Sequence, residues 1–134
     1  ISAFYSDGTV LDGVLAPYDG LSIGILSACK SAGYGTADLP LPKVTGQDCE
    51  VTSIKSMIAG EQYSSIYNNT TNLAEVAVKL TTQALNGEEV EVNSVYNNEV
   101  FDVPSMAISA SIITIDNYKE ELIDSGYIAA EDLQ

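Results

Sequence analysis

Apolar residues recur along this chain in two alternating patterns. The first is a short apolar run, residues 10–16, which Pro17 stops and which is followed by a stretch in which apolar side chains recur at helical spacing; two more short segments, each followed by such a stretch, come later in the chain. Each repeat predicts a strand and then a helix. The expected pairs are residues 10–16 with 21–32, residues 43–46 with 51–60, and residues 63–67 with 72–85. Three such pairs predict an α/β fold, a three-layer sandwich with a mostly parallel sheet.

Polar residues and glycines mark the ends of the expected helices. Asn72 is followed three positions later by Glu75, which predicts a cap at the start of the third helix. Gly60 and the Asn86-Gly87 pair are placed where the second and third helices should stop. These signals bound the second and third helices to within a few residues.

The last third of the chain has a different pattern. Residues 88–93 alternate between acidic and apolar side chains, and residues 103–115 are rich in β-branched residues. This composition predicts extended chain with a turn near Asn97. Asp116 and Asn117 are expected to cap one final helix.

Composition limits the class of protein. The 134 residues are 46% hydrophobic and 18% charged, which favours one globular domain over a disordered chain. Five lysines, no arginine and 19 acidic residues give a formal net charge of -14. Such a charge repels phosphate backbones and anionic lipid surfaces, so a nucleic-acid partner is excluded.

The longest apolar runs are far shorter than the roughly 20 residues that span a bilayer. No export leader precedes Ile1, so we expect that any such signal was removed or lies upstream. Cys29 and Cys49 are the two cysteines, and the chain has no histidine. A zinc site or a Cys-His nucleophile therefore does not fit, and we predict two buried free thiols.

Residues 44–50 place a carboxylate where a strand turns into a helix. In an open α/β sheet, ligands bind outside the carboxyl ends of the strands. Gly46 is expected to allow the tight turn that directs Asp48 into that crevice. Asp48 therefore either binds a ligand or caps the following helix.

Four segments in order then carry a family resemblance. They are residues 14–24, Val-Leu-Ala-Pro-Tyr-Asp-Gly-Leu-Ser-Ile-Gly; residues 45–50, Thr-Gly-Gln-Asp-Cys-Glu; residues 60–67, Gly-Glu-Gln-Tyr-Ser-Ser-Ile-Tyr; and residues 102–105, Asp-Val-Pro-Ser. Together they resemble the substrate-binding proteins of bacterial ABC sugar importers, in the branch of the xylose-binding and multiple-monosaccharide-binding proteins. The resemblance covers nearly the whole chain.

This resemblance implies a type I periplasmic binding protein fold, in which two α/β lobes close over one monosaccharide of the xylose, glucose or galactose type. The chain would be its C-terminal portion. Residues 1–66 would belong to the C-terminal lobe, residues 67–92 would pack on a missing N-terminal lobe, and residues 93–134 would return to the C-terminal lobe and form the tail. An isolated chain of this kind is expected to self-associate through the surface left bare.

The resemblance also implies partners and a location. The full protein would deliver its sugar to the membrane subunits of an ABC transporter. It would work in the cell envelope, in the periplasm or at the extracellular face, where a lipid anchor on the missing N-terminal part would hold it. No cofactor and no catalysis are required for such a function.

Four residues are candidates for contact with the sugar, whose hydroxyls both donate and accept hydrogen bonds. The resemblance assigns the ligand-binding Asp of the family to Asp48. Tyr18 stands where the family usually has Asn, and it either contacts the ligand or belongs to the core. Asn68 stands where the xylose-binding branch commonly has Lys, and it either binds a hydroxyl or forms a turn. Asp19 is either a ligand group or, with better support from its position, a helix cap.

Two other functions remain open at this point. A flavodoxin-like phosphoacceptor would use Asp19 and Asp48 to hold magnesium. Such a site, however, usually contains several convergent carboxylates and a lysine at a later strand end. The effector-binding domain of a sugar-responsive transcription repressor would have the same two-lobed fold. The acidic charge and the motifs around Asp48 favour the transport protein.

Overall fold

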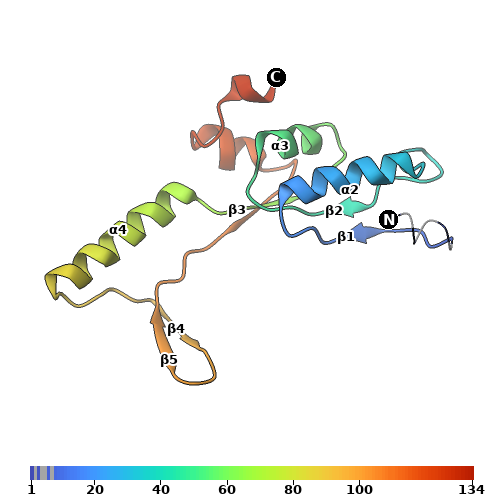
Figure 1. Cartoon of the computed structure of the whole chain (residues 1–134). Coiled ribbons are helices and arrows are strands. Elements are labelled where there is room, and N and C mark those ends of the chain that lie inside the picture. The colour runs from blue at the N-terminus through green and yellow to red at the C-terminus, as the bar shows by residue number, and fades with distance from the viewer. Residues whose placement is uncertain (2, 4–5, 7) are drawn as a thin grey trace. The chain divides into compact units, whose positions relative to one another are not determined.

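The computed structural model describes residues 1, 3, 6 and 8–134. The chain forms two compact units where composition favours one domain. Unit 1 consists of Ile1–Tyr67 with Ser111–Gln134, and unit 2 consists of Asn68–Ala110. The elements of both are labelled in Figure 1.

Unit 1 contains the first two expected strand and helix pairs. Its strands are β1 (Gly13–Val14), β2 (Lys43–Val44), β3 (Ser65–Tyr67) and β6 (Ser111–Ile113), and its helices are α2 (Asp19–Ser31), α3 (Val51–Ile58), the π-helical η1 (Lys119–Asp124) and the 3-10 helix η2 (Ala130–Leu133). The strands are shorter than the apolar runs that predict them. The final helix of the sequence is replaced by η1 and η2.

The sheet of unit 1 combines parallel and antiparallel neighbours. β1 and β2 pair in parallel, and Gln47 forms a parallel bridge with Ile66 of β3. β6 then pairs with β3 in the antiparallel sense. Two parallel links therefore lead from β1 to β3, as the repeated strand and helix pattern predicts.

One side of these strands carries the helices. α2 packs on α3 and on β2, and α3 also contacts η2 (Figure 1). On the strand segments, Leu15 is 89% exposed and Ile112 is 64% exposed. These two side chains line an open groove of about 400 Å³ that also includes Ile66. Apolar surface of the sheet is therefore uncovered among the residues that the structure describes.

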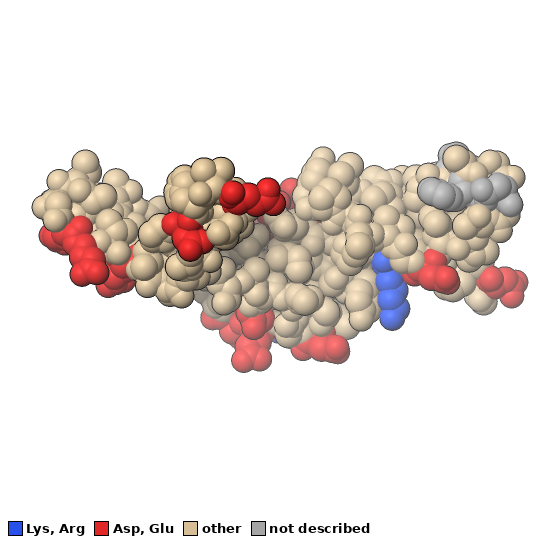
Figure 2. Space-filling model, turned by 90° about the horizontal axis from the view of Figure 1, so that it is seen from below, with Lys and Arg blue, Asp and Glu red and all other residues tan. Residues whose placement is uncertain are grey.

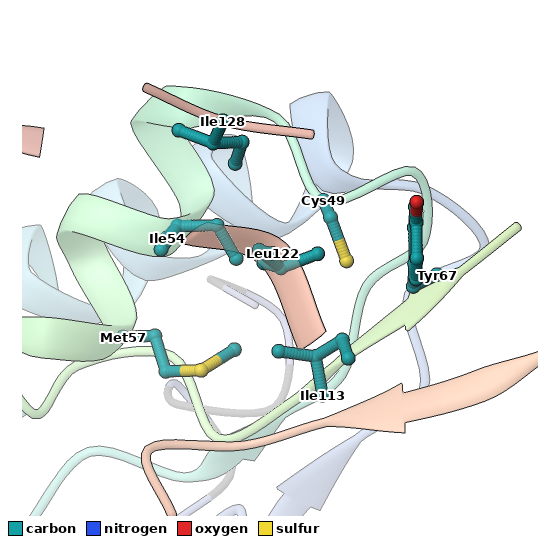
Figure 3. Close-up of a cluster of buried hydrophobic side chains, with 7 residues drawn as sticks. All are labelled: Cys49, Ile54, Met57, Tyr67, Ile113, Leu122 and Ile128. Atoms are coloured by element: carbon teal, nitrogen blue, oxygen red, sulfur yellow. The ribbon is translucent and has the colours of Figure 1, made fainter. Parts of the chain in front are cut away.

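A cluster of buried side chains holds α3 to the strands (Figure 3). Ile54 and Met57 of α3 lie beside Ile113 of β6 and Leu122 of η1. The remaining members are Cys49, Tyr67 and Ile128. Because Ile113 and Leu122 come from the end of the chain, this core forms only when Ser111–Gln134 returns to unit 1.

Unit 2 consists of a helix and a hairpin. Helix α4 spans Thr70–Asn86, and β4 (Ser94–Asn97) pairs with β5 (Asp102–Ser105). Lys79 of α4 and Glu91 form an ion pair with an Nζ to Oε2 distance of 2.6 Å.

The ends of α4 differ partly from expectation. Asn69 caps its start, and the Asn69 side chain accepts a hydrogen bond from the Asn72 N–H at 3.0 Å. The expectation that Asn72 is the cap is therefore wrong. At the other end, Gly87 adopts the left-handed conformation with φ 70°, which confirms the expected stop.

The chain re-enters unit 1 later than the sequence indicates. Residue 93, the expected point of return, is followed by β4, which pairs with β5 inside unit 2. The hairpin keeps this segment within unit 2 through its own ladder, and the chain rejoins unit 1 at Ser111. The expected cap at Asn117 is also wrong, because its side chain accepts from the Thr114 N–H before η1 begins.

Carboxylate side chains are spread over the face shown in Figure 2, in keeping with the net charge of -14. Among the described helices, none combines the length and the apolar character needed to cross a bilayer.

Candidate ligand-binding site

The candidate site lies where β1 and β2 end. Because these strands are parallel neighbours, the loops that follow them emerge at the same edge of the sheet. Tyr18 lies in the first loop, directly before α2, and Asp48 lies in the second, ahead of α3. A hydrogen bond from the Asp19 N–H to the Gln47 carbonyl, 3.0 Å long, joins the two loops.

Residues 46–50, which we call the Asp48 turn, have an unusual backbone. Asp48 has φ 92° and Cys49 has φ 54°. Positive φ disfavours residues other than glycine by roughly 1–2 kcal/mol each, because the Cβ approaches the neighbouring carbonyl. Such a conformation persists only where the surroundings enforce it.

Gly46 is required for a different reason from the one expected. Its φ is outside the left-handed region, so it does not supply the reversal of the backbone. A Cβ at this position would lie 2.0 Å from Asp19 Oδ1 and 2.6 Å from Gln62 Nε2. Gly46 therefore allows buried polar side chains to reach the backbone of the turn.

The main chain of the Asp48 turn is held by groups from β3 and from the end of the chain. The Asp48 N–H donates to the Ile66 carbonyl at 2.8 Å, and the Cys49 N–H donates to Ser65 Oγ at 3.2 Å. The Tyr127 hydroxyl donates to the Asp48 carbonyl at 3.3 Å. The Tyr127 ring packs against Tyr67, with 4.6 Å between the ring centroids.

Asp19 is fully buried, and its carboxylate is used inside the protein. Asp19 Oδ2 accepts the Glu50 N–H at 2.8 Å. Asp19 Oδ1 accepts from Ser65 Oγ at 2.8 Å and from Gln62 Nε2 at 3.1 Å. The expected capping of α2 by Asp19 is wrong, because the side-chain bonds of Asp19 go to the start of α3 and to β3.

Asp48 has the opposite environment. Its side chain is exposed, and the hydrogen bond that it accepts from Gln47 Nε2 is long, at 3.5 Å. Glu50 is the cap residue of α3, and α3 has no side-chain cap. The alternative role of Asp48 as a helix cap is therefore wrong. Its carboxylate oxygens are accessible and can accept hydrogen bonds from two vicinal hydroxyls.

The two other candidates lie in different units. Tyr18 is 45% exposed, and its ring lies beside Gly20, where an added Cβ would be 2.8 Å from Cε2. Asn68 is half-buried and is the first residue of unit 2, directly after β3. The structure therefore brings the Tyr18 and Asp48 loops together within unit 1.

Burial also changes the acidity of groups beside Asp48. It raises the pKa of the Cys49 thiol to about 12, an effect that the Ser65 hydrogen bond opposes and the charges of Asp19 and Asp48 reinforce. The pKa of the Tyr127 hydroxyl is raised by burial first and then by the charges around it. Both groups hold their protons at neutral pH.

A magnesium site receives no support from this geometry. Asp19 and Asp48 would have to converge on one ion, but the oxygens of Asp19 already accept three protein donors. Across the part of the chain that the structure describes, no cluster of three or more candidate metal ligands occurs.

Sequence reasoning missed three residues that support the Asp48 turn. Gln62 belongs to a quoted motif, and that membership is a signal that could have identified it, although its burial became known only from the structure. Ser65 is a polar residue inside an expected strand, which is a weaker signal. Tyr127 lies 79 positions from Asp48, and no local pattern connects the two.

Residues 1–89 match the sequence model of a family described as periplasmic binding protein domain. The chain belongs to this family. It is 46% identical over 136 residues to the multiple sugar-binding periplasmic receptor ChvE of Rhizobium radiobacter, an alignment that covers 100% of this chain and 38% of ChvE.

Solved structures agree with this family assignment. An ABC transporter solute binding protein from Clostridium phytofermentans with bound β-D-glucose is 37% identical, with a TM-score of 0.85 over 100% of this chain and 41% of that one. A carbohydrate transporter solute binding protein from Chloroflexus aurantiacus, in complex with D-glucose, is 34% identical, with a TM-score of 0.78 over 88% of this chain and 34% of that one. The α/β fold class and the family resemblance are confirmed. This periplasmic binding protein domain spans about two fifths of the length of such relatives.

Proposed function

We propose that this chain is the C-terminal part of the solute-binding component of an ABC sugar importer, and that Asp48 binds a monosaccharide. The observation that carries the proposal is the Asp48 turn. Its backbone N–H groups are held by the Ile66 carbonyl and the buried Ser65 hydroxyl, while the Asp48 carboxylate remains exposed at the edge of the sheet. The relatives, which are named as sugar-binding receptors and solute-binding proteins, support the same reading.

The chemistry of the site suits a neutral sugar. A carboxylate accepts hydrogen bonds from two adjacent hydroxyls, and such bonds to a charged group are stronger than those between neutral groups. Tyr18, in the loop after β1 at the same edge of the sheet, would offer an aromatic face or a hydroxyl. Asn68 offers an amide without adding charge. The function is binding and release, without a covalent step.

The remaining contacts would come from a second lobe outside this chain. Residues 1–66 would form part of the C-terminal lobe and residues 67–92 would pack on the N-terminal lobe. Within α4, which the structure describes throughout, no side chain is fully buried, and Val78 and Leu85 are 66% and 83% exposed. Apolar surface of this kind fits a helix that another part of the protein covers.

In this mechanism the sugar stabilises the closed arrangement of the two lobes, because it makes contacts to both only when they are closed. The membrane subunits of the transporter would recognise that closed state. The protein would therefore act in the cell envelope, at the periplasmic or extracellular face of the membrane.

The test is calorimetric titration of the full-length protein with D-glucose, D-galactose and D-xylose. We expect tight binding of at least one sugar by the wild type. Asp48→Ala should weaken that binding by about tenfold to a hundredfold, the range for loss of hydrogen bonds to a charged group.

Glu88→Ala is a suitable control, since it removes an exposed carboxylate that lies in unit 2, beyond the end of α4. The Glu88→Ala variant should bind the sugar with the same affinity as the wild type. Unchanged affinity in Asp48→Ala would refute the role of Asp48, and absence of binding to the whole panel would refute the sugar-binding function.

A further inference from the structure

Asp19 connects the two ends of the Asp48 turn. Its own N–H donates to the Gln47 carbonyl at 3.0 Å, and its Oδ2 accepts the Glu50 N–H at 2.8 Å. One residue thus holds the backbone on both sides of Asp48 and Cys49, the two residues with positive φ. The turn is anchored by the first residue of α2 and not by its own sequence.

The same carboxylate also links the turn to β3. Ser65 Oγ donates to Asp19 Oδ1 and accepts the Cys49 N–H. Ser65 therefore connects Asp19 to the middle of the turn through two hydrogen bonds. Gln62 Nε2 donates to the same oxygen, and Gln62 in turn accepts from the buried Ser53 hydroxyl. The network is fully enclosed, since Asp19, Ser53 and Ser65 are each 0% exposed.

The network requires a residue that only accepts. Three donors converge on the two oxygens of Asp19, one from the backbone and two from side chains. An asparagine of the same shape has one acceptor oxygen and an NH₂ group, so one buried donor would face another donor. The unpaired groups would weaken the hold on the turn more than the loss of one hydrogen bond does.

We propose that Asp19 is a positioning residue of the sugar site, which holds the Asp48 turn in its left-handed conformation and so keeps the Asp48 carboxylate presented to the ligand. This inference rests on the proposed function. Asp19 does not touch the sugar. Its effect on affinity passes through the backbone that it holds at Gln47 and Glu50.

The chain contains its own probe of the turn. Cys49 lies within the turn and Cys29 lies in α2, and both are buried free thiols. If Asp19 holds the turn, Asp19→Asn should let it open and should raise the rate at which Ellman's reagent modifies Cys49 by about tenfold or more. Cys29 should react as slowly as in the wild type. This measurement is made on the full-length protein without sugar.

Ser56→Ala is the matched control, because Ser56 is a buried residue of α3 whose hydroxyl bonds to Glu61 and not to the turn. It should change the modification of both thiols by less than about twofold. If Asp19→Asn does not fold, Ser65→Ala takes its place, since it removes the relay between Asp19 and the Cys49 N–H. The same selective exposure of Cys49 is then expected.

A double-mutant cycle links the turn to affinity. Asp19→Asn alone should weaken sugar binding about tenfold, in line with other supporting residues around a binding site. In the Asp48→Ala background, Asp19→Asn should weaken sugar binding only slightly further, because the carboxylate that Asp19 positions is already gone. Additive losses would show that Asp19 does not act through Asp48 and would overturn the proposal.

The two proposals fail separately. If no sugar binds to the wild type, the proposed function is refuted, while the thiol measurement still decides whether Asp19 holds the turn. If Cys49 stays as protected in Asp19→Asn as in the wild type, or if Cys29 becomes exposed to the same extent, the positioning role is overturned whatever the affinity.

Discussion

Neighbouring residues in the Asp48 turn have opposite environments. Asp48 is exposed, whereas Cys49 is 2% exposed and packs in the cluster with Ile54 and Met57. The two consecutive positive φ values turn one side chain outward and the next inward. At the scale of single residues, the turn therefore couples a ligand group to the core.

The buried Cys49 thiol makes stability sensitive to alkaline pH. Its pKa is raised by burial from an ordinary 9.0 to about 12. Below pH 9.0 the folded and unfolded chains both keep this proton, and the stabilisation is fully present. As the pH rises toward 12, the unfolded chain loses the proton first, so the free energy of unfolding should fall by about 1.4 kcal/mol per pH unit from this group.

Urea unfolding between about pH 8 and about pH 10.5 measures this slope. Burial raises the pKa values of Cys29, Tyr67 and Tyr127 in the same direction, so the comparison must be with Cys49→Ala. The variant should show a shallower fall with pH than the wild type. Parallel curves would mean that the Cys49 thiol is not shielded in the folded protein.

At the scale of elements, the close approach at Gly46 determines how the loops after β1 and β2 meet. Gly46→Ala places a Cβ against Asp19 Oδ1 and Gln62 Nε2, at 2.0 and 2.6 Å, in a network that is enclosed. We expect a loss of about 1–3 kcal/mol in the free energy of unfolding, as for other overpacked sites. Sugar affinity should fall in the same variant, because the turn must shift.

Gly24→Ala is the control for this change. Gly24 lies inside α2, and an added Cβ there would meet nothing within 4 Å. Alanine favours the helix over glycine, so this variant should gain about 0.5–1 kcal/mol with unchanged sugar affinity. Equal effects of the two substitutions on affinity would contradict the role given to Gly46.

Two asparagines, Asn69 and Asn72, are candidates for the N-cap of α4. Asn69 accepts the Asn72 N–H through its side chain, whereas Asn72 takes part through its backbone. Asn69→Ala should therefore lower the free energy of unfolding by about 1 kcal/mol, the usual contribution of a cap. Asn72→Ala should be neutral or slightly stabilising, since alanine favours the helix interior. Urea unfolding followed by circular dichroism decides between them, and the reverse order would restore Asn72 as the cap.

At the scale of the whole molecule, both units expose apolar surface. Leu15 and Ile112 are exposed in unit 1, and Val78 and Leu85 are exposed in unit 2. We expect the isolated 134-residue chain to self-associate at micromolar concentration, because such surface is stable in water only when it is covered.

Sedimentation velocity of the isolated chain tests this expectation. Leu85→Lys, which adds a charge to the exposed face of α4, should shift the distribution toward the monomer. Thr81→Lys adds the same charge at an exposed position that is already polar and should have less effect. A wild-type chain that sediments as a monomer at all concentrations would contradict the prediction.

The periodic parts of the fold were predictable. The helical spacing in residues 21–32 and 51–60 identifies α2 and α3, and Gly87 stops α4 as expected. These features depend on neighbours within a few positions, which the local sequence contains. The return of the chain at Ser111 was not predictable, because residues 103–115 are rich in β-branched residues throughout, and this composition does not mark where β5 ends and β6 begins.

The sequence by itself determined the α/β class, the acidic charge, the two unpaired thiols and the place of Asp48 between a strand and a helix. Only the tertiary structure decided which carboxylate faces solvent. Asp19 and Asp48 both lie where a strand gives way to a helix, so their local patterns are alike. Asp19 is buried because its partners Glu50 and Ser65, 31 and 46 positions away, supply donors that satisfy its oxygens. Hydrogen bonds between residues so far apart in the sequence form only after the strands have paired. The local pattern of apolar and polar residues therefore cannot predict them.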